Sequence, residues 1–228
     1  HVKYRKMEEE IAEQLSKSSV DFIAGGGHKF FFDREDGQNL WPVLESNGFI
    51  IDTSEFLHPR VLDYELKYAF LPAYEAMPMM TEGRGDFLPH ATEQALEYLS
   101  QHKKGFFLIV EGSQIDWGGH ANDSEYIIQE TLDFDRAVGK ALDFAEKDGN
   151  TLVVVTADHE TGGYALSSVE VRRQRDYAHI QPTFSTGGHT ASLIPVLAFG
   201  PEAHRFTGFM ENNDIFYKLL EAYQWNNE

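Results

Sequence analysis

TLVVVTADHETGG (residues 151–163) gives the clearest indication of how this chain folds. Residues 152–156 form an apolar, β-branched run, which is typical of a strand buried on both faces of a parallel sheet. Asp158 and His159 follow the run, and both are metal-ligand types at the point where open α/β sheets bind ligands. On this stretch alone, a capping Asp and a hydrogen-bonded His at an ordinary strand end is an equally good interpretation.

The composition describes a globular protein and excludes several partners. With 228 residues, 42% of them hydrophobic, the chain can form one large α/β domain. A formal net charge of −18 argues against nucleic acid as a partner, and it would repel a phosphate ester unless bound cations made the site locally positive. The chain has no cysteine, so any metal must be held by His, Asp and Glu. No apolar run approaches the roughly 20 residues of a membrane span, so no membrane partner is expected.

Apolar periodicity predicts helices that alternate with strands, which implies a mostly parallel sheet sandwiched between helices. The predicted helices are 2–15, 39–47, 91–101, 125–147 and 214–223, and the predicted strands are 20–24, 49–52, 105–110, 152–156 and 194–199. Residues 58–86 have no clear period and are expected to form an irregular connection. Residues 167–185 are polar and partly basic, which predicts a small exposed insertion or loop.

Ligand-type residues recur at the ends of the predicted strands. Glu111 ends the strand at 105–110, and Asp116 and His120 follow it at i, i+4 spacing, so they share one face of a helical turn. His189 lies in STGGHT (residues 185–190), just before the last predicted strand. If the sheet is parallel, the ends of the two central strands lie on one edge, and these donors converge there.

Asp116, His120 and His189 offer one carboxylate and two imidazoles, the donor set of a catalytic zinc. Asp158 and His159 form half of a second such set, provided that the chain leaves β geometry there, because neighbouring strand side chains point in opposite directions. Glu111 offers oxygen and better suits Mg²⁺. Taken singly, each residue is as readily explained as a solvated pair, a cap or an ion-pair partner, and only their joint placement favours a metal centre.

The sequence resembles the alkaline phosphatase family over essentially its whole length. The resemblance is carried by three segments that match the family's metal-binding motifs in order and spacing, VEGSQIDWGGHAND (110–123), TLVVVTADHETGG (151–163) and STGGHT (185–190). It implies that Asp116, His120 and His189 bind a first zinc, that Asp158 and His159 bind a second, and that Glu111 binds magnesium. It also implies that Arg5, in HVKYRK, grips the phosphate as a catalytic and substrate-binding residue, for which its planar fork is suited.

The departures from the family pattern are informative. Family members carry a metal-ligating Asp, the nucleophilic Ser and an acid/hydroxyl pair ahead of the position of Arg5, and none of these is in this sequence. We therefore expect a single alkaline phosphatase-like α/β domain (1–228) that is incomplete, lacking its N-terminal portion, and inactive by itself. Trp117 stands where relatives often have Lys or His. It could shape the substrate entrance, and packing on the rim is an equally good interpretation.

The resemblance implies a metal-dependent phosphomonoester hydrolase that acts through a phosphoserine intermediate, with two Zn²⁺ and one Mg²⁺ in the full-length enzyme. Small phosphate monoesters are the expected substrates and inorganic phosphate the product. A homodimer and a periplasmic or extracellular location are expected from the family alone. A phosphodiesterase or other metallohydrolase of the same superfamily, or a non-catalytic metal-binding domain, are the alternatives. Relative rates on monoesters and diesters distinguish a monoesterase from a phosphodiesterase. Chelator treatment of the full-length protein distinguishes an enzyme from a non-catalytic metal-binding domain.

Overall fold

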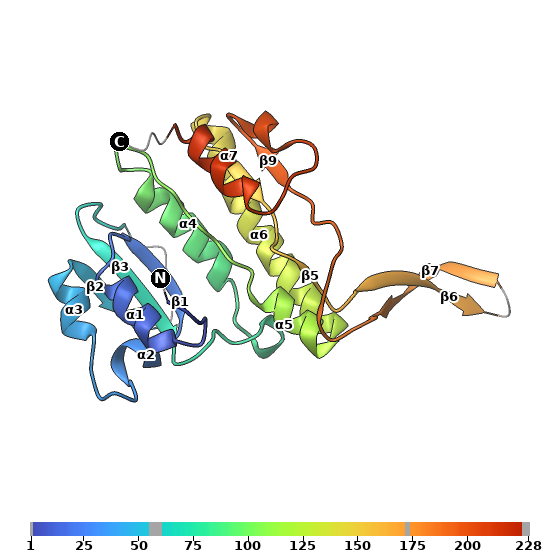
Figure 1. Cartoon of the computed structure of the whole chain (residues 1–228), viewed down its shortest axis with the longest axis horizontal. Coiled ribbons are helices and arrows are strands. Elements are labelled where there is room, and N and C mark those ends of the chain that lie inside the picture. Colours follow the sequence, from blue (N-terminus) through green and yellow to red (C-terminus); the bar gives the residue numbers. More distant parts are fainter. Residues whose placement is uncertain (1, 55–60, 172–173, 225–228) are drawn as a thin grey trace. The chain divides into compact units, whose positions relative to one another are not determined.

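The computed structural model describes residues 2–54, 61–171 and 174–224. The chain divides into two compact units, residues 1–110 and residues 111–228. The first unit contains, in chain order, α1 (Glu8–Ser16), β1 (Phe22–Gly26), α2 (Lys29–Phe32), α3 (Trp41–Ser46), β2 (Phe49–Asp52), β3 (Lys67–Ala73), a 3₁₀ turn (Met80–Glu82) and α4 (Phe87–Leu99) (Figure 1).

The first unit is a parallel sheet with helices on both faces. Its strand order is β1-β3-β2, and β3 pairs in parallel with both neighbours. Successive side chains of a strand point to opposite faces. Tyr68 and Phe70 accordingly pack with α4, in a core that includes Tyr98. Ala69 and Leu71 point the other way and pack with residues of α1, α2 and α3, such as Leu44. The fold is therefore mixed α/β with a parallel sheet and helices, as the sequence predicts.

The second unit contains α5 (Gln114–Ala121), α6 (Ser124–Asp148), β4 (Val153–Val155), β5 (Glu160–Thr161), β6 (Ala165–Val171), β7 (Gln174–Thr183), β8 (His189–Thr190), β9 (Leu197–Phe199), a 3₁₀ turn (Ala203–Phe206) and α7 (Asp214–Ala222). Its strands form three antiparallel pairs, β4 with β9, β5 with β8, and β6 with β7. The long helix α6 begins at a cap, where the Asp123 carboxylate accepts the Tyr126 N–H at 3.1 Å, and ends at Gly149 with φ of 72°.

Several sequence expectations are wrong in detail. The run at 152–156 is not buried on both faces of a parallel sheet, since β4 pairs antiparallel with β9 and, in the described residues, has no second neighbour. Residues 105–110 form no strand, because no partner among the described residues supplies a hydrogen-bonded ladder. Phe106 and Leu108 still pack on the first core, while Phe107 and Ile109 are exposed.

Three further segments can be compared with the sequence expectations. Residues 58–86 contain β3, the central strand of the parallel sheet, although 58–60 lie outside the described residues. The small exposed insertion or loop expected at 167–185 is largely the β6–β7 hairpin, a two-stranded ribbon that extends away from α5 (Figure 1). The helix expected at 2–15 begins only at Glu8, which leaves Arg5 in a turn.

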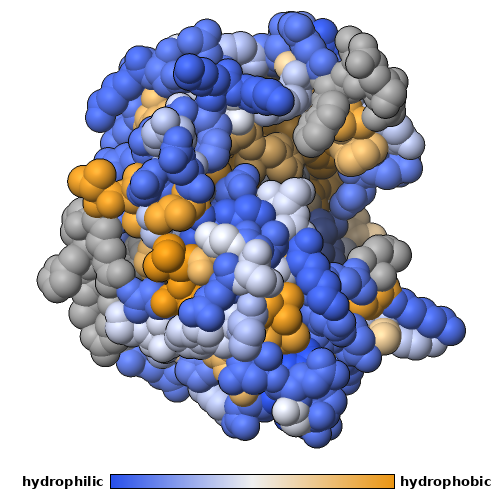
Figure 2. Space-filling model, turned by 90° about the vertical axis from the view of Figure 1, so that its left-hand side faces the viewer, coloured by the Kyte–Doolittle hydropathy of each residue, from blue (hydrophilic) through white to orange (hydrophobic). Residues whose placement is uncertain are grey.

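The surface agrees with the acidic composition. Hydrophilic side chains cover most of the face drawn in Figure 2, and the hydrophobic ones gather there in small separate groups. Across the described residues, no helix combines the length and the apolar character needed to cross a membrane.

Candidate metal centre

The candidate ligands of the second unit come from three neighbouring segments. Asp116 and His120 lie one turn apart on α5, and His189 is the first residue of β8. Asp158 and His159 lie in the irregular segment between β4 and β5. The chain thus leaves β geometry at Asp158, which is the condition for both of its neighbouring side chains to face one ion.

Two glycines allow α5 to approach the strands and α6 closely. A Cβ on Gly119 would lie 2.7 Å from the carbonyl oxygen of Thr161 on β5. A Cβ on Gly118 would lie 2.9 Å from the backbone nitrogen of Ile127 on α6. Real Cβ atoms do not approach backbone atoms this closely, so Gly118 allows the close contact of α5 with α6 and Gly119 allows that of α5 with β5.

Asp116, His120 and His189 bring one ligand atom each within 4.8 Å of the others. The two Nε2 atoms of His120 and His189 are 3.2 Å apart. Asp116 Oδ1 lies 3.5 Å from His120 Nε2 and 3.6 Å from His189 Nε2. Two imidazoles and one carboxylate oxygen therefore face a common point.

Hydrogen bonding determines which nitrogen of His120 can face a cation. Its Nδ1 lies 2.7 Å from the carbonyl oxygen of Gly187, and a carbonyl can only accept. Nδ1 therefore carries a proton, and when the ring is neutral its Nε2 presents a lone pair, as metal-binding histidines do. That lone pair faces a second imidazole and a carboxylate, an arrangement that a cation would stabilise.

The spacing fits zinc. Bonds of about 2.0–2.1 Å in a tetrahedral arrangement place two ligand atoms about 3.4 Å apart. The three distances measured between the donor atoms, 3.2, 3.5 and 3.6 Å, bracket this value. With three protein ligands, one position of a tetrahedral ion remains for water or substrate.

A second pair of donors lies beside the first set. His159 Nε2 is 3.1 Å from Asp158 Oδ2, and the rings of His159 and His189 stack with centroids 3.5 Å apart. In the part of the chain that the structure describes, no third His, Asp or Glu completes a cluster with Asp158 and His159. The interpretation of these two residues as half of a second donor set stays a prediction.

Glu160 ties the segments of the centre together. Its carboxylate accepts the backbone N–H of Gly163 at 3.1 Å and that of Tyr164 at 3.0 Å, and it also accepts the hydroxyl of Thr190 beside His189. Burial alone would raise the pKa of Glu160, but these donors outweigh it and hold the pKa below its ordinary value. Glu160 is therefore an ionised clamp between β5 and β8.

Glu111 and Trp117, the other predicted site residues of the second unit, do not belong to this cluster. Glu111 is exposed and lies three residues ahead of α5. Trp117 follows Asp116 on α5 and is 43% exposed, so its ring is not packed into the interior. Arg5 is exposed and belongs to the first unit.

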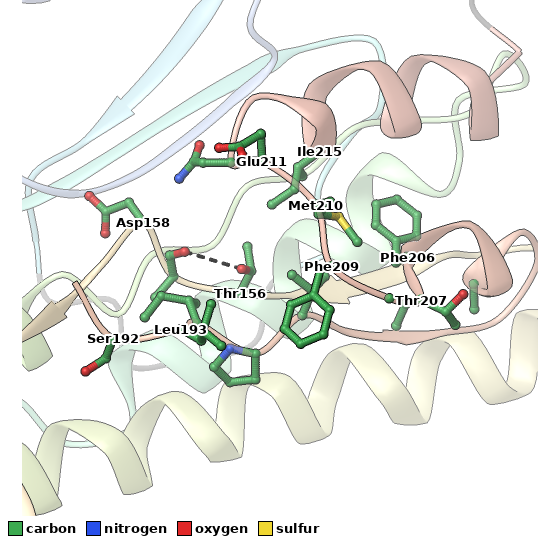
Figure 3. A pocket seen from close by; sticks show the side chains of 18 residues that line it. Thr156, Asp158, Ser192, Leu193, Phe206, Thr207, Phe209, Met210, Glu211 and Ile215 are labelled. Atoms are coloured by element: carbon green, nitrogen blue, oxygen red, sulfur yellow. Dashed lines mark hydrogen bonds between the residues drawn. The ribbon is translucent and has the colours of Figure 1, made fainter.

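A pocket of about 700 Å³ reaches the segment that carries Asp158 (Figure 3). Asp158 lies at one end of the pocket, and Phe206, Phe209 and Met210 gather at the other. Glu211 is the other acidic residue of the lining, and the lining contains no Lys or Arg. These residues offer an anion such as phosphate no positive charge, and a bound cation would favour its binding here.

Sequence reasoning missed two residues of the centre, Glu160 and Thr161. Thr161 donates its hydroxyl to Asp116 Oδ1 at 2.6 Å and lies 3.2 Å from His159 Nδ1. Both residues are in the DHETGG motif, and their position directly after two candidate ligands is the signal that could have found them. Their types alone gave no indication, because neither was needed as a ligand.

The parallel sheet between helices and the histidine–carboxylate cluster define an α/β protein with a candidate divalent-metal centre. The profile of the family described as Alkaline phosphatase matches residues 3–183. The chain therefore belongs to the alkaline phosphatase family.

Similar proteins agree with this assignment. The chain is 36% identical to the alkaline phosphatase of Escherichia coli (strain K12), over 93% of this chain and 54% of that protein. It is 29% identical to alkaline phosphatase 4 of Bacillus subtilis (strain 168), over 97% of this chain and 63% of that protein. The structure of alkaline phosphatase from the Antarctic bacterium TAB5 superimposes with a TM-score of 0.92 at 49% identity, over all of this chain and 67% of that one. A variant of the TAB5 enzyme with Mg bound in its M3 site matches equally well, with a TM-score of 0.92. The chain thus spans between about half and two thirds of the length of these relatives.

Proposed function

We propose that this protein hydrolyses phosphate monoesters with the help of bound divalent cations. The observation that carries the proposal is the convergence of Asp116, His120 and His189 at zinc-like spacing. Membership of the alkaline phosphatase family supports the substrate class. When bound, zinc would supply the positive charge that polarises a P–O bond and stabilises an oxygen anion.

The protein's own residues would hold and orient these cations. Asp116, His120 and His189 would bind the first zinc, and Asp158 and His159 would contribute to a second. Glu111 would contribute an oxygen ligand to magnesium. Arg5 would bind two phosphate oxygens through its guanidinium fork, and Trp117 would border the substrate entrance.

The reaction would pass through a phosphoserine, as the family resemblance implies. We assign the nucleophile to no serine of this sequence, and therefore expect no turnover by the 228-residue polypeptide alone. Inorganic phosphate would be the product. A homodimer and a periplasmic or extracellular location complete the proposal, and both rest on the family alone.

Zinc affinity of the chain tests the proposal without requiring turnover. The metal-free chain is titrated with zinc against a chromophoric chelator, and one tight site per chain is expected. His120→Asn and Asp116→Asn should each weaken that site by at least about 100-fold, because each removes a ligand. His90→Gln, an exposed histidine on α4, is the matched control and should bind as the unmodified chain does.

Two results would contradict the proposal. If the unmodified chain binds zinc no more tightly than His120→Asn, the cluster is not a metal site. If the chain retains the site but a longer protein containing it hydrolyses only diesters, the substrate class is wrong.

A further inference from the structure

The hydroxyl of Thr161 lies between the two sets of candidate ligands. Its Oγ1 is 2.6 Å from Asp116 Oδ1, in the three-donor cluster, and 3.2 Å from His159 Nδ1, in the neighbouring pair. No other residue described by the structure is hydrogen-bonded to both Asp116 and His159. A threonine hydroxyl is a weaker metal ligand than an imidazole or a carboxylate, and both sets already consist of those stronger ligands.

Counting protons fixes the direction of both hydrogen bonds. An ionised carboxylate can only accept, so the single proton of the Thr161 hydroxyl goes to Asp116 Oδ1. The contact with His159 then requires that His159 Nδ1 donate to the hydroxyl oxygen. Nδ1 of His159 therefore carries a proton in this contact, which leaves Nε2 as the ring nitrogen that faces Asp158, 3.1 Å from its Oδ2.

The backbone of Thr161 is fixed from two directions. It pairs with His189 in the β5–β8 ladder, so the residue beside the hydroxyl is itself a candidate ligand. On the other side, Gly119 of α5 packs directly against Thr161. A Cβ on Gly119 would lie 2.7 Å from the carbonyl oxygen of Thr161 and 2.8 Å from its Cβ. The hydroxyl therefore has one well-defined position between α5 and the segment after β4.

We propose that Thr161 is a positioning residue that orients Asp116 and His159 together, and so couples the two cation sites of the centre. This inference rests on the proposed function, because it assigns Thr161 a role in holding the ligands of that centre. Through one hydroxyl, the rotamer of the Asp116 carboxylate and the tautomer of the His159 ring become dependent on each other. Binding a cation at one set then favours the geometry that the other set needs.

The test compares three variants of the 228-residue chain. Thr161→Val keeps the shape and removes the hydroxyl, whereas Thr161→Ser keeps the hydroxyl and should restore what Val loses. Thr183→Val removes a hydroxyl of the same unit that donates to the Ala165 carbonyl, on the β6–β7 hairpin, and controls for Thr→Val replacement as such. Urea unfolding of each variant shows whether it folds.

Two measurements are made on the folded variants. Zinc affinity should fall about 10- to 100-fold in Thr161→Val and stay within about threefold of the unmodified chain in Thr161→Ser and Thr183→Val, as expected for a residue that orients ligands. The imidazole ¹⁵N shifts of His159 are recorded without metal, at about pH 8.5, where an ordinary histidine is neutral. The Nδ1 shift should change in Thr161→Val, because that variant removes the hydrogen-bond partner of Nδ1, and should stay as in the unmodified chain in Thr161→Ser and Thr183→Val.

The outcomes separate this inference from the proposed function. If the unmodified chain binds no zinc, both fail. If it binds zinc, and Thr161→Val binds equally tightly with the same His159 nitrogen shifts, the role of Thr161 alone is refuted. If Thr161→Val does not fold, Thr161→Ser becomes the decisive variant, and loss of either its zinc affinity or its His159 nitrogen shifts would refute the role of the hydroxyl.

Discussion

The Glu160 carboxylate accepts two backbone N–H groups, of Gly163 and Tyr164, and the hydroxyl of Thr190. In Glu160→Gln, an NH₂ group replaces one of the two carboxylate oxygens. That NH₂ group would face a hydrogen-bond donor instead of accepting from it. We expect Glu160→Gln to lower the free energy of unfolding by about 1–3 kcal/mol, the cost of a lost hydrogen bond to a charged group. Urea unfolding measures this, and Glu146→Gln, at an exposed position of α6, should change nothing. An equal loss of unfolding free energy in both variants would contradict the role of Glu160 in holding β5 and β8 together.

Tyr98 should make the first unit less stable at strongly alkaline pH. Burial, followed by the nearby charge of Asp21, raises the pKa of Tyr98 to about 12, and its hydroxyl donates to the Leu66 carbonyl at 2.6 Å. In the unfolded chain the phenol ionises near its ordinary pKa of 10. A raised folded-state pKa means that stability is complete below pH 10 and is lost as pH rises toward 12.

Tyr98→Phe tests this dependence. The variant should lose about 1–2 kcal/mol at neutral pH, because the Leu66 carbonyl loses its donor. Its urea midpoint should then decline less than that of the unmodified chain between pH 10 and 12. Tyr217→Phe, at a tyrosine that is 60% exposed, should leave both the neutral midpoint and its pH dependence unchanged. Parallel declines in all three proteins would refute the assignment to Tyr98.

Residue types were the most predictable part of the centre. His120 and His189 were expected to meet, and their Nε2 atoms lie 3.2 Å apart. Thr161 and Glu160 were not anticipated, because their importance depends on where a strand pair places a hydroxyl and a carboxylate. That placement is a tertiary property, and a sequence pattern of period two or 3.6 does not contain it.

At the level of elements, the contact between α5 and β5 depends on Gly119. A methyl group there would lie 2.7 Å from the Thr161 carbonyl oxygen, so Gly119→Ala must push α5 away from β5. We expect it to weaken zinc binding by at least about tenfold and to destabilise the chain by about 1–3 kcal/mol, as overpacking does. Zinc titration and urea unfolding measure the two effects.

Gly139 supplies the matched control. It lies within α6, and a Cβ there would meet nothing within 4 Å. Gly139→Ala should therefore stabilise the helix by about 0.5–1 kcal/mol and leave zinc affinity unchanged. If Gly119→Ala behaved in the same way, the close packing of α5 on β5 would not matter for the centre.

Helices were easier to predict than strands, for a physical reason. The repeat of apolar residues in α6 and α7 and the caps of α6 are local, and both helices lie within a residue of the predicted ranges. A strand needs a partner. The apolar run at 105–110 has none among the described residues and stays irregular, whereas β3 was missed because Pro72 and scattered aromatics obscure its pattern, although two neighbours pair with it.

At the scale of the whole chain, the donors converge by a different route from the one predicted. The sequence argument placed them at one edge of a parallel sheet. The parallel sheet instead belongs to the first unit, and the candidate ligands of the second unit meet where α5 packs on the antiparallel pair of β5 and β8. The motifs therefore identified residues that meet in space, although the parallel-sheet geometry from which we predicted the meeting was wrong.

All donors of the cluster lie in the second unit, so zinc should protect that unit selectively. A ligand that binds only the folded state stabilises it by about 2.7 kcal/mol at a concentration 100 times its Kd. Hydrogen exchange should therefore slow in α5, β5 and β8 when zinc is added, and remain as it was in β1, β2 and β3. His120→Asn should abolish the change, and His90→Gln should retain it. Because the donors of the cluster lie on α5 and β8, zinc-dependent protection confined to the first unit would place the cation elsewhere and remove the basis for the proposed centre.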